Sequence, residues 1–246
     1  MNKKKILSID FDYYQNVTKK HLSIYPDGVD NDTSLSELVW GGIYGSVSKI
    51  AKLVKNIEIR KDELDLTKTI IANQRTDIPV KIANSHKHIY DFIYEYADVN
   101  EPLRLINVDM HHDMFNDNLK DNVLDCGNWV SFICNEFKTD LTWIANPVSS
   151  EMYGLKKVKN AEQIDRMIPL SVNAIKDMQF DMIFMCRSDT WTPPHLDPYF
   201  DELITVMRDH FDRIIAETSV LSPRKEYLKI AEENARIRNE FVKSSK

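Results

Sequence analysis

Residues 107–113, with the sequence NVDMHHD, constrain the fold more than any other part of the chain. The apolar run 103–108 predicts a buried strand that ends in carboxyl and imidazole side chains. In an extended chain, residues i, i+2 and i+4 share one face, so we expect Asp109, His111 and Asp113 to converge. Charged groups at the end of a buried strand need a partner, and two carboxylates with an imidazole suit a divalent cation such as Mn²⁺ or Zn²⁺.

Two further apolar runs also end in polar side chains. Residues 5–12 close on Asp10-Phe11-Asp12, which places a second pair of carboxylates at a strand end. Residues 180–186 are followed by the sequence RSDTWTPPH at 187–195. Three separate apolar runs with polar residues at the same end indicate one shared site more strongly than any single motif does.

Between these strands the pattern predicts helices and shorter strands. Ser34 and Glu37 have capping-box spacing, which predicts a helix over 34–54 that is interrupted by glycines. Ser85 precedes a helix that is expected to begin at His86 and to end near residue 96. We also expect strands at 67–73, 80–84 and 141–145. One further helix is expected to start at 127–129, and others are expected to cover 162–178, 198–211 and 224–242.

Strands that alternate with helices favour an α/β fold in three layers, α/β/α, with a mostly parallel sheet covered on both faces. The functional residues of such folds collect beyond the carboxyl ends of the strands. We find no internal repeat or linker, and therefore expect residues 1–246 to form a single domain.

Composition excludes several classes of function. The chain has 246 residues, of which 43% are hydrophobic and 28% charged, and a net charge of −6, which argues against a nucleic-acid binder. Three cysteines without a CxxC pair indicate reduced thiols and a cytoplasmic location. Two aspartates interrupt the first apolar run, so we expect neither a signal peptide nor a membrane span. The charged C-terminal helix has a narrow apolar stripe for the body of the protein or for a second subunit, which leaves a homo-oligomer open.

Asp109-x-His111-x-Asp113 after a strand resembles a metal motif of the ureohydrolases, the arginase and agmatinase superfamily. Ser8-x-Asp10-x-Asp12 resembles the other metal motif of that superfamily, although it stands first in this chain and follows the first motif in ordinary arginases. The resemblance implies an arginase-like fold and a binuclear Mn²⁺ site at the carboxyl ends of the strands. The implied ligands, with His86 as the isolated histidine at a helix start, are Asp10, Asp12, His86, Asp109, His111 and Asp113.

The chain is also similar to the peptide arginases, which hydrolyse arginine side chains of ribosomally made precursor peptides to ornithine and urea. The segments that carry this similarity are SIDFDYY, SHKHIYDFI, NVDMHHDM, DCGNWV and RSDTWTPP. It implies two Mn²⁺ ions and an arginine-containing precursor peptide as the partner. The expected reaction is attack of a metal-bridging hydroxide on the guanidinium carbon, with Asp109 and Asp10 as the bridging carboxylates.

A cationic substrate requires an acidic group at the site, and Asp189 at the end of the third strand is the candidate. The alternative is that Asp189 is a capping or turn residue. His112 is a candidate proton shuttle, with His88 and His195 as alternatives. Asn128 is a candidate for contact with the substrate backbone, or for orienting a ligand. Trp191 is a candidate for the entrance, where an indole can stack on an arginine.

Other functions stay open on the sequence alone. A phosphatase of the haloacid dehalogenase type also has Asp-x-Asp after its first strand, but leaves Asp109, His111 and Asp113 unexplained. A second alternative is an arginase-fold hydrolase that acts on a free guanidino or acetylamino compound. A third is a non-catalytic peptide binder that keeps the metal for stability.

Overall fold

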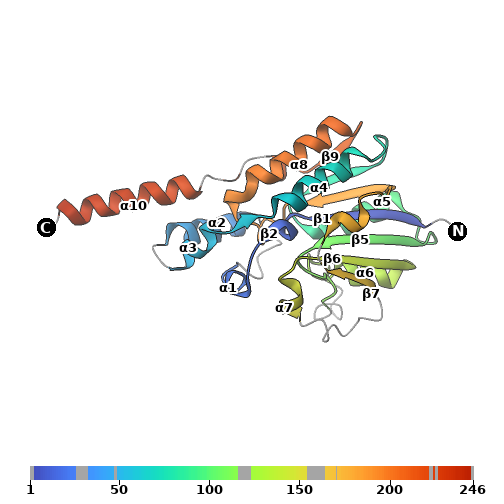
Figure 1. The fold of residues 1–246 in the computed structure, drawn as a ribbon, viewed down its shortest axis with the longest axis horizontal. Helices are drawn as coiled ribbons and strands as arrows, with labels where there is room; N and C mark the ends of the chain where they lie inside the picture. Colours follow the sequence, from blue (N-terminus) through green and yellow to red (C-terminus); the bar gives the residue numbers. More distant parts are fainter. Residues whose placement is uncertain are drawn as a thin grey trace.

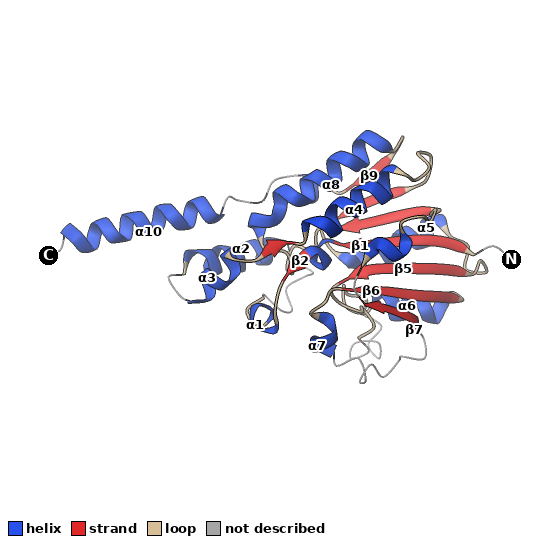
Figure 2. Cartoon of the chain, in the orientation of Figure 1, coloured by secondary structure: helices blue, strands red, loops and turns tan. Residues whose placement is uncertain are grey.

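The computed structural model describes residues 3–25, 33–46, 49–115, 123–153, 164–169, 171–221, 224 and 227–244. Its centre is a sheet of seven strands in the order β7-β6-β5-β1-β8-β4-β9, and every pairing between neighbours is parallel (Figures 1 and 2). The strands are β1 (Lys4–Asp10), β4 (Val80–Ala83), β5 (Leu103–Asp109), β6 (Thr139–Ala145), β7 (Ile164–Pro169), β8 (Met182–Cys186) and β9 (Ile214–Ala216).

Helices cover both faces of this sheet. Alternate side chains of a strand point to opposite faces, so each buried strand contributes to two cores. Leu7 and Ile9 of β1 pack with α4 (Lys61–Ala72) and α8 (Asp197–His210). Ile6 belongs to the other core, which contains α5 (Ile89–Tyr96) and α6 (Trp129–Glu136). The chain is therefore an α/β protein with a parallel sheet between two helical layers, as the alternation of strands and helices predicted.

The register of the central strands explains how motifs that are far apart in the sequence meet in space. Strand β1 pairs with β5 on one side, with Ser8 opposite Asn107, and with β8 on the other, with Asp10 opposite Cys186. The end of β1 therefore lies beside the end of β5, although about a hundred residues separate them in sequence. Side chains that follow these strands meet at one edge of the sheet.

Smaller elements gather at that edge (Figure 1). They include the antiparallel pair of β2 (Gln15–Asn16) and β3 (Glu58–Ile59) and the short helix α7 (Ser149–Tyr153). The others are α1 (Lys19–Leu22), α2 (Thr33–Gly45), α3 (Lys49–Lys55) and α9 (Thr218–Leu221). Helix α10 (Tyr227–Ser244) extends away from the body and carries the C-terminus (Figure 1).

Several predicted elements are wrong. Residues 67–73 belong mostly to helix α4 rather than to a strand, because Leu64, Ile70 and Ile71 repeat at helical spacing and are buried. The helix expected over 162–178 is instead strand β7 followed by a 3-10 turn at Val172–Ile175. Pro169 ends the strand there, and this segment of mixed polarity pairs with β6. The helix expected over 34–54 with interruptions at glycines is two helices, α2 and α3, and the expected interruption is confirmed at Gly45, where α2 ends.

Other predictions are confirmed with small shifts at their ends: strands β1, β4, β5, β6 and β8 and helices α5, α6, α8 and α10. The turn His86–His88 is a 3-10 helix that leads into α5, and Ser85 stands at its N-cap without a side-chain capping bond. Strand β9 was not predicted, because its three residues are too few to show a period. Within the described part of the chain, no helix is long and apolar enough to cross a membrane.

Candidate metal centre

Six of the predicted ligand residues come together at the carboxyl edge of the sheet. Asp10 ends β1, Asp12 lies in the 3-10 turn Phe11–Tyr14, and His86 begins the turn after β4. Asp109 ends β5, and His111 and Asp113 follow it in the next loop. All six side chains are buried, from 0% exposed for Asp12 and Asp109 to 8% for His111.

His86 is surrounded by three carboxylates. Its Nδ1 atom lies 3.2 Å from Asp10 Oδ2, 3.1 Å from Asp109 Oδ2 and 3.0 Å from Asp113 Oδ2. The other ring nitrogen, Nε2, is 2.6 Å from the hydroxyl of Ser8. One end of the imidazole is thus held by a hydrogen bond, and the other faces the carboxylates.

His111 forms a second group with two carboxylates. Its Nδ1 atom lies 2.9 Å from Asp12 Oδ2 and 3.7 Å from Asp109 Oδ1. The two oxygens of Asp109 therefore face different histidines, Oδ1 towards His111 and Oδ2 towards His86. This arrangement includes two adjacent groups of potential ligands, Asp12-Asp109-His111 and His86-Asp109-Asp113, which share one carboxylate. A third group, Asp10-His86-Cys186, shares His86 with the second and brings in a cysteine that the sequence did not indicate.

The separations within these groups suit donors that surround a cation. Two donors at right angles, each about 2.1 Å from a shared ion, lie about 3.0 Å from each other. His86 Nδ1 has three oxygens at such distances, yet it makes no aligned hydrogen bond to any of them. Asp12 Oδ2 and His111 Nε2 are also buried without a hydrogen bond. Buried polar atoms without a hydrogen bond are rare in proteins, and a bound ion is one common reason for them.

Charge balance supports the same interpretation. Four buried carboxylates carry four negative charges, and two divalent cations would neutralise them. Burial alone lowers the pKa of His86, but the carboxylates around Nδ1 outweigh it and raise the pKa well above its ordinary value. Burial and the neighbouring Asp10 raise the pKa of Asp12. Burial opposes ionisation of Asp109 as well, but His111 and His86 outweigh it and lower its pKa. Carboxylates buried this closely are stabilised by positive charge among them, which protonated histidines or bound cations supply.

We expected the ligands to converge along a continuous extended strand. In the structure they converge through turns instead. Strand β5 ends at Asp109, whose Oδ1 accepts the backbone N–H of His111 at 2.7 Å. Asp113 has a φ angle of 50°, a left-handed conformation that is uncommon for residues other than glycine. Asp12 is likewise in a turn, which Asp10 caps by accepting the N–H of Asp12 at 3.0 Å. Strained backbone of this kind clusters at functional sites.

Neighbouring side chains hold the ligands in place. Asn107 donates to Asp109 Oδ2 at 3.2 Å, and the indole N–H of Trp129 donates to Asp113 Oδ2 at 2.6 Å. The role of Trp129 was missed because an apolar helix position reads as core. Ser8 and Asn107 could have been predicted, since each stands two residues before a ligand on the same strand face.

We expect Trp129→Phe to weaken metal affinity by about 10- to 100-fold while the protein still folds, since the change removes one donor to Asp113 and keeps an aromatic ring. Titration of Mn²⁺ into chelator-treated protein measures the affinity. Trp40→Phe is a matched control, because this equally buried indole donates to the backbone oxygen of Asp189 instead. Equal loss in both variants would contradict the assigned role of Trp129.

His112 does not face the carboxylates. Its ring packs against Phe115, Tyr153 and Trp143 at centroid distances of 4.4, 4.5 and 5.8 Å, and its Nδ1 accepts the N–H of Met114 at 2.9 Å. Burial, with a further contribution from His111, lowers the pKa of His112 to about 4. A neutral imidazole at pH 7 lacks the proton that a general acid needs. The structure therefore does not support the predicted proton-shuttle role.

The two alternatives for that role are held elsewhere. His88 lies 3.4 Å from Glu217 on the outer side of the turn. His195 makes hydrogen bonds to the hydroxyl of Tyr44 and, at 2.8 Å, to the backbone oxygen of Ile57. Neither histidine is among the groups of potential ligands in the described part of the chain.

The buried carboxylate of Asp189 is paired with an arginine of the protein itself. It receives two hydrogen bonds from the buried guanidinium of Arg187, at 2.5 and 3.2 Å, and the backbone oxygen of Asp189 receives one from Arg224 at 2.9 Å. Arg224 also pairs with Asp197. The prediction that Asp189 grips a substrate guanidinium is not supported, because a guanidinium of the protein already occupies that carboxylate.

The side chain of Asn128 is also engaged by the protein, through hydrogen bonds to the backbone. Its side-chain nitrogen donates to the backbone oxygen of Val123, and its side-chain oxygen accepts the N–H of Asp125, both at 2.9 Å. Both ends of the amide thus fix the loop before α6, which leaves the predicted substrate contact unsupported. Trp191 does lie at the site, with its ring centroid 4.5 Å from that of His111.

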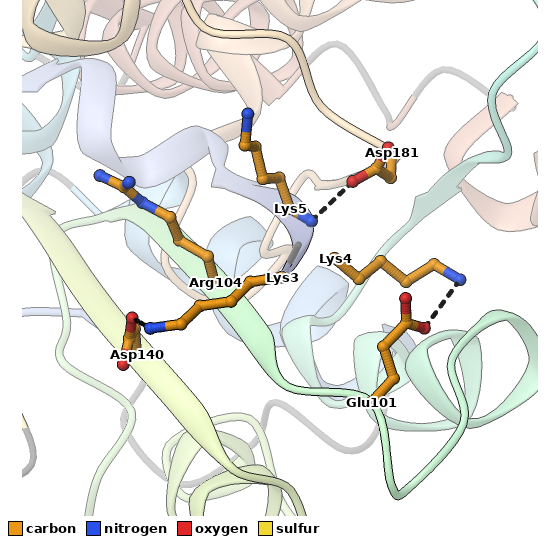
Figure 3. Close-up of a pocket in the computed structure, with 7 residues that line it drawn as sticks. All are labelled: Lys3, Lys4, Lys5, Glu101, Arg104, Asp140 and Asp181. Atoms are coloured by element: carbon orange, nitrogen blue, oxygen red, sulfur yellow. Dashed lines mark hydrogen bonds and ion pairs between the residues drawn. The ribbon is translucent and has the colours of Figure 1, made fainter. Parts of the chain in front are cut away.

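A large hollow lies at the opposite edge of the sheet and is separate from the candidate metal centre (Figure 3). It has a volume of about 690 Å³, and its lining residues are Lys3, Lys4, Lys5, Glu101, Arg104, Asp140 and Asp181. Lys3 pairs with Asp140 and Lys4 with Glu101. Exposed and partly paired charges of this kind give no indication of catalysis.

The chain was compared with protein-family models, curated proteins and solved structures, and none of the three comparisons found a match.

Proposed function

We propose that the protein is a binuclear metallohydrolase that uses two Mn²⁺ ions to convert arginine side chains of a precursor peptide to ornithine, with release of urea. The observation that carries the proposal is the position of Asp109, whose two oxygens face two different histidines at the edge of a parallel sheet. The hydrolysis of a guanidinium as the reaction rests on the resemblance to the arginase superfamily and the peptide arginases.

The residues present fit two ions with oxygen and imidazole ligands, which is the donor set that Mn²⁺ prefers. Asp10, His86 and Asp113 would hold the first ion with one oxygen of Asp109, and Asp12 and His111 would hold the second with the other. Two such ions, when bound, supply a water of lowered pKa at neutral pH.

The protein itself contributes position and charge. Hydrogen bonds from the backbone N–H groups of Asp12, Met110 and His111 and from the side chains of Asn107 and Trp129 hold the carboxylates in the positions from which they would bind the two ions. Preorganised ligands of this kind need no rearrangement when a cationic substrate arrives. The ligand carboxylates also make the edge of the sheet attractive to a cation.

The most direct test is to incubate the protein with Mn²⁺ and an arginine-containing peptide and to follow the peptide by mass spectrometry. We expect a loss of about 42 Da for each arginine converted, with an equal amount of urea. Free arginine in parallel reactions distinguishes a peptide substrate from a small molecule.

Two results would contradict the proposal. Release of phosphate from a phosphate ester, without urea, would favour a phosphatase that uses Asp10. Metal binding without any mass change, on peptides encoded beside this protein or on free guanidino and acetylamino compounds, would favour a peptide binder that keeps the metal for stability.

A further inference from the structure

The candidate metal centre comes closest to solvent at His111. Of the six ligand residues, His86 is 1% exposed and lies behind Trp129 and Phe184, whereas His111 is 8% exposed, the largest value of the set. A substrate that reaches the ions must therefore pass the ring of His111. The side chains around this ring decide what can enter.

Two partly exposed aromatic rings flank His111. The ring of Trp191 lies 4.5 Å from it and that of Tyr153 lies 6.4 Å from it, between centroids. Trp191 comes from the loop after β8 and Tyr153 from α7, so the two rings approach from different strands of the sheet. Both keep part of their surface accessible, while the ligands behind them are buried.

Hydrogen bonds to the backbone hold the two segments that carry these rings. The N–H of Trp191 donates to the backbone oxygen of Ser188, which has a φ angle of 54°, and Gln15 donates to the oxygen of Trp191 at 2.7 Å. Helix α7 is tied to the metal loop because the hydroxyl of Ser149 donates to the oxygen of Met110 at 2.6 Å. Rings fixed in this way offer a binding surface with little loss of entropy.

We propose that Trp191 and Tyr153 form an aromatic clamp that selects a planar, cationic guanidinium side chain at the entrance to the metal centre. Aromatic faces attract cations, and a guanidinium stacks flat on them while its apolar stem stays in contact with the rings. The clamp supplies the recognition that Asp189 cannot, since Arg187 holds that carboxylate. This inference rests on the proposed function and names the feature of the substrate that the entrance reads.

The test compares two short, fluorescein-labelled peptides that carry one arginine or one citrulline between neutral residues. Citrulline has the same planar shape without the charge. Binding to Mn²⁺-loaded protein is measured by anisotropy in the first minutes after mixing. We expect wild-type protein to prefer the arginine peptide by about tenfold, and Trp191→Leu or Tyr153→Leu to reduce this preference to about twofold or less.

Conservative variants separate recognition from folding. Trp191→Phe and Tyr153→Phe keep a ring and should keep most of the preference, with an unchanged Mn²⁺ content by elemental analysis. Tyr94→Leu is the control, because Tyr94 is an exposed aromatic on α5 that pairs with Glu136.

An equal preference in wild-type protein and both leucine variants would overturn the clamp, as would wild-type protein that binds the two peptides equally well. The proposed function is read out separately as urea. Ring-dependent preference without urea would leave the clamp standing and overturn the reaction, whereas urea with ring-independent binding would do the opposite.

Discussion

Asp109→Asn is expected to remove both metal ions and to reduce urea formation by more than about 100-fold. This loss is larger than the roughly 100-fold upper limit seen when a residue that only orients a metal ligand is removed. The reason is that one carboxylate serves two ligand groups, and an amide offers a single neutral oxygen in place of two charged ones. Elemental analysis after gel filtration measures the metal, and the peptide assay measures the activity.

Asp140→Asn is the matched control. Asp140 lies near the start of β6, the strand next to β5, with 40% of its side chain exposed and Lys3 as its partner. It should leave metal content and activity unchanged, because its surface ion pair is worth little. Asp109→Asn protein that still holds two ions per chain would refute the shared-ligand assignment.

Arg187→Met is expected to lower the free energy of unfolding by about 3–5 kcal/mol, because it leaves Asp189 as a buried carboxylate without its main partner. Arg187 is 1% exposed, and Asp189 is 4% exposed. Asp189→Asn should be destabilising in the same way, since it removes the charge opposite two buried arginines, Arg187 and Arg224. Urea denaturation followed by circular dichroism gives the free energies.

This experiment also distinguishes the two roles considered for Asp189. A substrate-gripping carboxylate would give an Asp189→Asn protein of normal stability with a raised KM for the peptide. An internal partner gives a less stable protein whose KM is unchanged where it is folded. Arg236→Met, on the exposed face of α10, is the control and should change stability by less than about 0.5 kcal/mol. Equal effects of Arg187→Met and Arg236→Met would argue against the buried pair.

Local patterns in the sequence were sufficient to predict the buried strands at the centre of the sheet. Strands β1, β5 and β8 are largely apolar runs with polar residues at or just after their ends, and such runs identify buried parallel strands. The helix predicted at 162–178 failed because Ile164–Pro169 carries a mixed pattern, and its pairing with β6 decides its conformation. Helix α4 was missed because its apolar residues were read at the wrong period.

The candidate ligands were identified from residue type and position at strand ends, because carboxylates and imidazoles at the end of a buried strand need a cation. That reasoning does not depend on the order of strands in the sheet. It predicted Asp10, Asp12, Asp109, His111 and Asp113, while His86 was expected only from the resemblance to the ureohydrolases; the structure brings all six together.

Local polarity and spacing were enough to predict the α/β class, the buried strands and five of the six candidate ligands, and the resemblance to the ureohydrolases added His86. Only the tertiary structure decided which partner each remaining polar side chain has. It turned His112 towards aromatic rings, paired Asp189 with Arg187, and placed Tyr153 beside His111. These contacts join residues from separate loops, and the packing of the whole chain selects among many partners that local sequence leaves equally available.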